Sequence, residues 1–148
     1  MRLMVGDLEV LFPYDYIYPE QYEYMCRLQS CLLKGHCLLE MPTGTGKTVT
    51  LLSLITSFQY AHTECGKLVY CTRTVQEMDK VVEELRGVMA YREKELAKDR
   101  EALGPGATIR DPKILGVCLS ARRNMCIHPT VSRFDNPGKV PQTPRPHL

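Results

Sequence analysis

The pattern of apolar and polar positions at the start of the chain predicts a hairpin followed by a helix. Apolar residues alternate on both sides of Gly6-Asp7, which predicts a β-hairpin over residues 3–12 with a two-residue turn. Pro19, followed by Glu20, is typical of the first turn of a helix, and Gly35 suits the position just after its end.

Farther along, three short apolar runs are typical of buried parallel strands. They are residues 36–39, 67–71 and 114–119. Helical spacing separates them, first over residues 49–60 and then at the apolar positions Val75, Met78, Val82, Leu85 and Met89. Strands that alternate with helices predict an α/β fold with a parallel sheet and helical crossovers.

The last third of the chain is more polar. Eight of the ten residues 92–101 are charged, which predicts a solvated helix extension or a linker, and Gly104-Pro105-Gly106 interrupts it. The proline-rich residues 132–148 cannot bury enough apolar surface to offset their ordering entropy. We therefore expect one domain over residues 1–131 and a disordered tail over residues 132–148.

Composition changes this picture little. Hydrophobic residues make up 44% and charged residues 24% of the 148 residues, and the net charge of +2 is too small to indicate nucleic-acid binding by itself. No apolar run approaches the ~20 residues of a membrane span, and the N-terminus lacks the apolar region of a signal peptide. The seven cysteines form no C-x-x-C unit, so we expect reduced thiols in the cytosol or nucleus and no membrane partner.

The strongest chemical signal is a glycine-rich turn between a predicted strand and a predicted helix. Its residues are Met41, Pro42, Thr43, Gly44, Thr45, Gly46, Lys47 and Thr48. Such a turn directs backbone N–H groups at a phosphate chain, with the lysine on the β- and γ-phosphates and the threonine hydroxyl on Mg²⁺. Met41 replaces the first glycine of the general pattern, and the short form Thr-Gly-x-Gly-Lys-Thr is the one that superfamily 2 helicases use. The alternative is a glycine-rich turn that merely precedes a helix.

Four stretches together resemble the XPD family of superfamily 2 iron–sulfur helicases. They are residues 12–21, 40–48, 70–74 and 120–129, in this order. The resemblance runs from residue 1 to about residue 134 and is looser through residues 91–113. The first and last of these stretches are specific to the family, whereas the glycine-rich loop alone indicates only a nucleotide-binding protein.

This resemblance implies an ATP-dependent DNA helicase that moves 5′ to 3′ on single-stranded DNA. It implies two RecA-like motor domains, an iron–sulfur domain and an arch domain in the whole enzyme. It further implies TFIIH subunits as partners, roles in nucleotide excision repair and transcription initiation, and a nuclear location. The chain would then contain a partial RecA-like parallel sheet, the ATP-binding part of the first motor domain.

The resemblance also assigns roles to individual residues. Gln21 matches the region that recognises adenine; the alternative is a solvated helix residue. Thr72, Arg73 and Thr74 match a motif that contacts the DNA backbone, although Thr72 or Thr74 could also cap a helix. Cys126 matches the first of four ligands of a [4Fe–4S] cluster, and the iron–sulfur region would begin near residues 120–129. Arg122 and Arg123 would touch the cluster or DNA.

Several parts of the family pattern do not occur in the printed sequence. No cysteine follows Cys126, and the Asp-Glu-Ala-His box and the second motor domain with its arginine finger are missing. We therefore expect a truncated chain that binds ATP and Mg²⁺ but has no catalytic residue, no hydrolysis and no [4Fe–4S] cluster, with Cys126 a free and partly exposed thiol. Two other hypotheses are a phosphate-loop kinase or GTPase, which the lack of an Asn-Lys-x-Asp motif disfavours, and a non-enzymatic segment that binds nucleotide, DNA or a partner.

Overall fold

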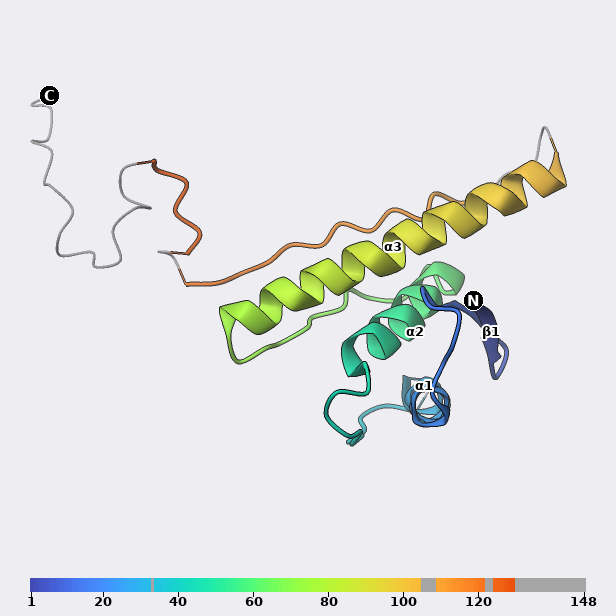
Figure 1. The fold of residues 1–148 in the computed structure, drawn as a ribbon, viewed down its shortest axis with the longest axis horizontal. Helices are drawn as coiled ribbons and strands as arrows, with labels where there is room; N and C mark the ends of the chain where they lie inside the picture. Colours follow the sequence, from blue (N-terminus) through green and yellow to red (C-terminus); the bar gives the residue numbers. More distant parts are fainter. Residues whose placement is uncertain (33, 105–108, 122–123, 130–148) are drawn as a thin grey trace, which may run out of the picture. The chain divides into compact units, whose positions relative to one another are not determined.

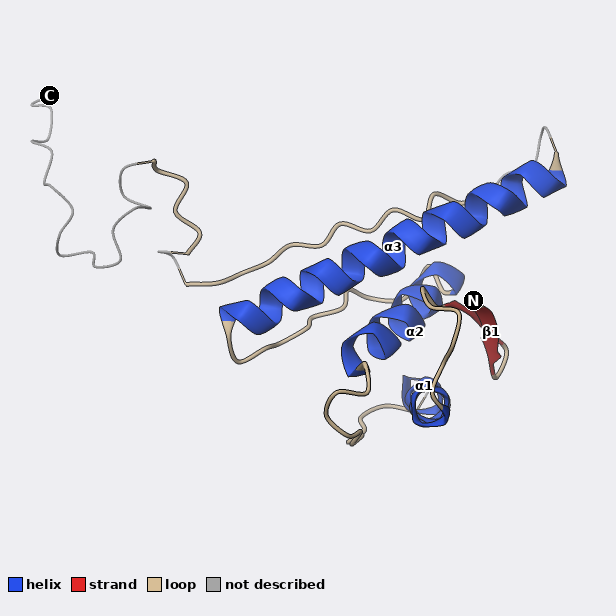
Figure 2. Ribbon diagram, in the orientation of Figure 1, coloured by secondary structure: helices blue, strands red, loops and turns tan. Residues whose placement is uncertain are grey.

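The computed structural model describes residues 1–32, 34–104, 109–121 and 124–129. The elements are β1, β2, α1, α2 and α3 in chain order (Figures 1 and 2). Residues Met1–Gly116 form one compact unit and the chain from Val117 belongs to a second. The expected disorder of residues 132–148 and the domain boundary near residue 131 lie outside the described residues.

The predicted hairpin is confirmed. Strands β1 (Arg2–Val5) and β2 (Leu8–Leu11) pair antiparallel, and the pair Val5–Leu8 closes the turn. Gly6 has a φ of 59°, the left-handed conformation that a tight turn of this kind requires. Val5, Leu8 and Val10 are buried, so one face of the hairpin belongs to the core.

The three predicted helices are also present. Helix α1 spans Pro19–Leu32, α2 spans Lys47–Ala61 and α3 spans Val75–Leu103. The charged residues 92–101 continue α3, so the helix-extension alternative holds and the linker alternative is wrong. Gly104, with a φ of 80°, lies at the C-cap of α3, where the expected break begins.

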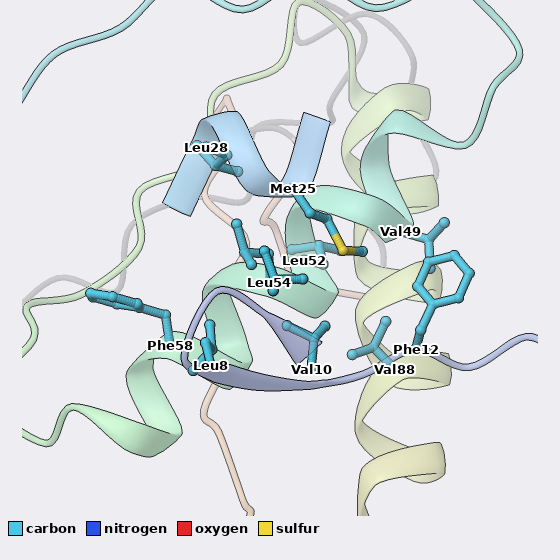
Figure 3. Close-up of a cluster of buried hydrophobic side chains, with 11 residues drawn as sticks. Leu8, Val10, Phe12, Met25, Leu28, Val49, Leu52, Leu54, Phe58 and Val88 are labelled. Carbon is cyan, nitrogen blue, oxygen red and sulfur yellow. The ribbon is translucent and has the colours of Figure 1, made fainter. Parts of the chain in front are cut away.

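Helix α2 lies at the centre of the core. It packs against β2, α1 and α3, and Figure 3 shows the apolar side chains that converge there. Leu8, Val10 and Phe12 come from the hairpin and the segment after it, and Val88 comes from α3. The helix that follows the glycine-rich loop is therefore held on three sides, which fixes the direction of its N-terminus.

The predicted parallel strands are not formed in the part of the chain that the structure describes. The only sheet there is the hairpin. No strand forms over residues 36–39, 67–71 or 114–119. The side chains of Leu38, Val69 and Leu115 are 99%, 80% and 89% exposed. A parallel strand is stable only with backbone partners beside it and helices over both faces. These runs have the apolar composition of strands, but no neighbouring strand pairs with them in the described part of the chain. They therefore remain loops.

A second correction concerns the charged end of α3. Arg92 is only 1% exposed and Leu96 is 8% exposed, although the sequence suggested a solvated stretch. Both continue the apolar stripe of α3, four and eight residues after Val88, and this spacing is the signal that could have revealed them. The guanidinium donates to the Thr56 carbonyl at 2.7 Å and to the hydroxyls of Thr56 and Ser57 at 2.8 Å.

The buried guanidinium has no carboxylate among these contacts. Burial lowers the pKa of Arg92 to about 10, and the neighbouring Tyr60 acts in the opposite direction. This value leaves the side chain charged near neutral pH. The Tyr60 ring lies 5.7 Å from the guanidinium carbon, a cation–π distance. Arg92 thus ties α3 to α2 by hydrogen bonds that the sequence did not suggest.

None of the helices in the described part of the chain is both long enough and apolar enough to cross a membrane.

Candidate functional site

The glycine-rich loop leads directly into the N-terminus of α2. Gly44 and Gly46 have φ values of 81° and 73°, and Gly46 is the N-cap residue. Because the N-cap residue is a glycine, no side chain of its own accepts hydrogen bonds from the N–H groups in the first turn of α2. The first N–H groups of a helix carry partial positive charge, and in this position they are suited to an anionic ligand. The positive φ values and the helix that the motif predicts are present, whereas the strand predicted before the loop at residues 36–39 is not formed.

Lys47 lies over its own loop. Its ammonium donates to the carbonyl of Met41, and the Thr45 hydroxyl donates to the carbonyl of Pro42 at 2.7 Å. Met41 is 4% exposed and so anchors the start of the loop in the core, whereas Pro42 and Thr43 are exposed. The general pattern has a glycine at this position, and a glycine would have no side chain to bury there. Burial of the Met41 side chain is thus a physical reason for the departure from the pattern.

Thr48 is the second residue of α2 and is half-buried. Its hydroxyl is a hard oxygen donor, the class of ligand that Mg²⁺ prefers. The residue type and its place in the first turn of α2 fit the predicted role.

Gln21 connects α1 to the loop. Its amide nitrogen donates to the Thr45 carbonyl at 2.9 Å, and its amide oxygen accepts from the Tyr18 N–H at the same distance. The residue is 4% exposed, so the alternative of a solvated helix residue is wrong. A Cβ on Gly46 would lie 2.7 Å from the same amide nitrogen, which shows how closely the two segments approach.

Tyrosines surround the start of α1. Tyr14, Tyr16 and Tyr18 are 51%, 66% and 53% exposed, and the rings of Tyr16 and Tyr18 meet edge to face with centroids 5.3 Å apart. Because Gln21 bonds to both Tyr18 and Thr45, this aromatic segment is connected to the glycine-rich loop through one side chain. Flat, exposed rings are suited to contact a base.

Thr72, Arg73 and Thr74 form a separate network at the start of α3. Thr74 is the N-cap and accepts from the Glu77 N–H at 3.2 Å, so the capping alternative is correct for this residue. The Thr72 hydroxyl donates to the Thr74 carbonyl at 3.1 Å. The Arg73 side chain is 91% exposed and lies 3.2 Å from the Glu77 carboxylate.

Cys126 belongs to the second unit and is half-buried, a free thiol in the structure. A turn lies just before it, where the N–H groups of Asn124 and Met125 donate to the Ala121 carbonyl. Groups of three or more His, Cys, Asp or Glu side chains that could hold a metal ion are not found among the described residues. Arg122 and Arg123 lie outside the described residues.

Comparison with protein families gives two matches. The DEAD_2 model matches residues 70–143 and the model "Type III restriction enzyme, res subunit" matches residues 17–106. These ranges are 74 and 90 of the 148 residues, so each covers half of the chain or more. Helicase families of this kind imply a RecA-like α/β fold.

Individual relatives of the chain are also named as helicases. The general transcription and DNA repair factor IIH helicase subunit XPD of Schizosaccharomyces pombe is 47% identical over 92% of this chain, and the XPD/RAD3 subunit of Saccharomyces cerevisiae is 45% identical over 90%. The mouse regulator of telomere elongation helicase 1 is 27% identical over 91%.

The chain spans 16% of the length of the two XPD relatives and 13% of the mouse protein. The identity to XPD subunits is much higher than to the telomere helicase, over a similar share of the chain. The chain therefore belongs to the DEAD_2 family and is similar to the XPD helicase subunits of transcription factor IIH.

Proposed function

We propose that the chain is the nucleotide-binding segment of an XPD-type, ATP-dependent DNA helicase that moves 5′ to 3′. The observation that carries nucleotide binding is the loop Gly44–Lys47 at the N-terminus of α2, with two left-handed glycines and a lysine. The helicase part of the proposal rests on the DEAD_2 match and on the similarity to XPD subunits. ATP would lie with its phosphates against this loop, Lys47 would leave the Met41 carbonyl to contact them, and Thr48 would hold Mg²⁺. The bound Mg²⁺ would neutralise charge on the β- and γ-phosphates.

The adenine would lie beside the Tyr14–Tyr18 segment. Gln21 has one amide with donor and acceptor groups, which suits adenine, but both groups bond within the protein. Gln21 would therefore either exchange these bonds for bonds to the base or hold the loop in shape while a tyrosine stacks on the base.

Single-stranded DNA would contact the chain at Thr72, Arg73 and Thr74. The exposed guanidinium, two hydroxyls and the N-terminus of α3 lie next to one another there, and all are groups that bind phosphate. The two XPD relatives are named as subunits of general transcription and DNA repair factor IIH. The partners of this chain would accordingly be factor IIH subunits, and its roles would be in nucleotide excision repair and transcription initiation in the nucleus.

Nucleotide binding is tested with the variant Lys47→Ala. A charge-assisted contact contributes about 1.5–3 kcal/mol, so affinity for a fluorescent ATP analogue should fall about tenfold or more. Lys67→Ala is the matched control, because Lys67 is an exposed lysine outside the loop. Equal affinities of the wild type and Lys47→Ala would reject the assignment.

The second candidate function is binding without hydrolysis. The printed sequence contains no Asp-Glu-Ala-His box, the source of the carboxylates that hold Mg²⁺ and activate water. We expect ATP binding but no DNA-stimulated phosphate release by the purified chain. Release that Lys47→Ala abolishes would favour the enzyme over the binding segment.

A further inference from the structure

Glu77 contacts both the backbone and the side chain of Arg73. Its Oε2 accepts from the Arg73 N–H at 3.0 Å, and its Oε1 lies 3.2 Å from Arg73 Nη2. The Glu77 N–H donates in turn to the Thr74 hydroxyl at 3.2 Å. The bond from the Glu77 N–H to the Thr74 hydroxyl is one half of a capping box. The Glu77 carboxylate accepts not from the N–H of the cap residue but from that of Arg73, one residue earlier, and adds an ion pair to the same residue.

These contacts restrict Arg73 while leaving it accessible. The guanidinium contacts the carboxylate through Nη2 alone, at 3.2 Å. A guanidinium has five N–H donors in a planar fork, so most of its donors are not used in this contact. The side chain is 91% exposed, so the rest of the fork faces solvent. The carboxylate therefore does not saturate the cation.

The carboxylate accepts from the backbone of Arg73 as well as from its side chain. The backbone N–H of Arg73 is the largest cause of the lowered pKa of Glu77, and the Arg73 side chain and the Thr74 backbone contribute in the same direction. Glu77 is thus ionised near neutral pH, and its carboxylate is held by the Arg73 N–H just before α3. A fixed anion beside a long, flexible cation limits the directions that the cation takes.

We propose that Glu77 is a positioning residue that holds the Arg73 guanidinium toward a phosphate of single-stranded DNA. The proposal rests on the DNA contact given under the proposed function, and it adds a residue that acts only through Arg73. Side-chain entropy lost on binding is reduced when the free protein already holds the side chain in place.

The sign of the effect separates this role from general electrostatics. Replacing an acidic side chain by a neutral one makes the chain more positive, and this alone strengthens binding to a polyanion. Loss of positioning weakens binding instead. Because an exposed ion pair holds a side chain only weakly, Glu77→Gln should weaken DNA binding up to about fivefold, despite the gain in net charge.

The test measures fluorescence anisotropy of labelled oligothymidylate with the full chain at several salt concentrations. The variants are Arg73→Ala, Glu77→Gln, the double variant and Glu83→Gln, an exposed acidic residue on the same helix. We expect weaker binding for Arg73→Ala and Glu77→Gln, and equal or tighter binding for Glu83→Gln. The salt dependence should be shallower for Arg73→Ala, since one phosphate contact is lost.

The double variant distinguishes positioning from a structural effect on α3. If Glu77 acts through Arg73, adding Glu77→Gln to Arg73→Ala causes no further weakening, whereas a loosened helix would weaken binding in both backgrounds. Tighter binding by Glu77→Gln would show that the carboxylate competes with DNA, and would overturn the proposal. Unchanged binding by Arg73→Ala, or no binding by the wild type, would instead reject the DNA contact itself.

Discussion

Arg92 offers the most direct test of how α2 and α3 are held together. Its guanidinium makes three hydrogen bonds to Thr56 and Ser57, and its stem is buried with it. Hydrogen bonds to a charged group contribute about 1.5–3 kcal/mol each when only one partner is removed. Desolvation of the guanidinium offsets part of this gain. The net effect therefore depends on what replaces the side chain.

Truncation to alanine removes both the donors and the volume. Arg92→Ala should lower the free energy of unfolding by about 2–4 kcal/mol, on the scale of large-to-small changes in a core. Arg92→Met keeps most of the stem and removes the charge. The Thr56 and Ser57 hydroxyls can then donate to carbonyls of their own helix, so this variant should lose only about 0–1.5 kcal/mol.

Urea unfolding followed by circular dichroism measures these differences. With a slope of about 2 kcal/mol per molar urea, Arg92→Ala should shift the midpoint by about 1–2 M. Arg86→Ala is the matched control, because Arg86 is exposed on the same helix. A change within about 0.5 kcal/mol for Arg92→Ala, typical of surface positions, would refute the reasoning. Equal losses for the alanine and methionine variants would show that the hydrogen bonds, and not the stem, dominate.

Three further predictions concern the loop, acid stability and metal. Gly46→Ala should weaken binding of the ATP analogue severalfold, because a Cβ would lie 2.7 Å from the Gln21 amide in a left-handed conformation, whereas Gly66→Ala, with open space around it, should bind normally. Hydrogen bonds from Lys98 and Arg2 lower the pKa of Glu95, so its contribution is present above the unfolded pKa of about 4.3 and is lost as pH falls through the lower folded pKa. Urea unfolding between pH 7 and pH 3 should therefore show a smaller acid loss for Glu95→Gln than for the wild type, and equal losses would contradict the ion pairs. Anaerobic purification with iron and sulfide analysis should find no [4Fe–4S] cluster, since four thiolates are required; stoichiometric iron that Cys126→Ser removes would contradict this.

Local signals in the sequence determined much of the chain. The turn at Gly6-Asp7, the helix start at Pro19 and the glycine-rich loop before α2 were all predicted, because turn residues and helix caps act through neighbouring atoms. The family was evident from the residues as well, and the DEAD_2 match shows it. The functional roles of the loop, of Thr72–Thr74 and of Cys126 stay predictions.

Tertiary contacts decided the rest. The apolar runs around Leu38, Val69 and Leu115 have strand composition, but pairing depends on backbone neighbours that composition does not supply. The charged context of Arg92 suggested solvent, and Gln21 was expected to contact adenine, with solvent as the alternative. Both side chains are buried because groups distant in the chain accept their hydrogen bonds. Burial of a polar side chain depends on whether a partner exists in space, and spacing along one helix shows which face a residue occupies but not what lies opposite.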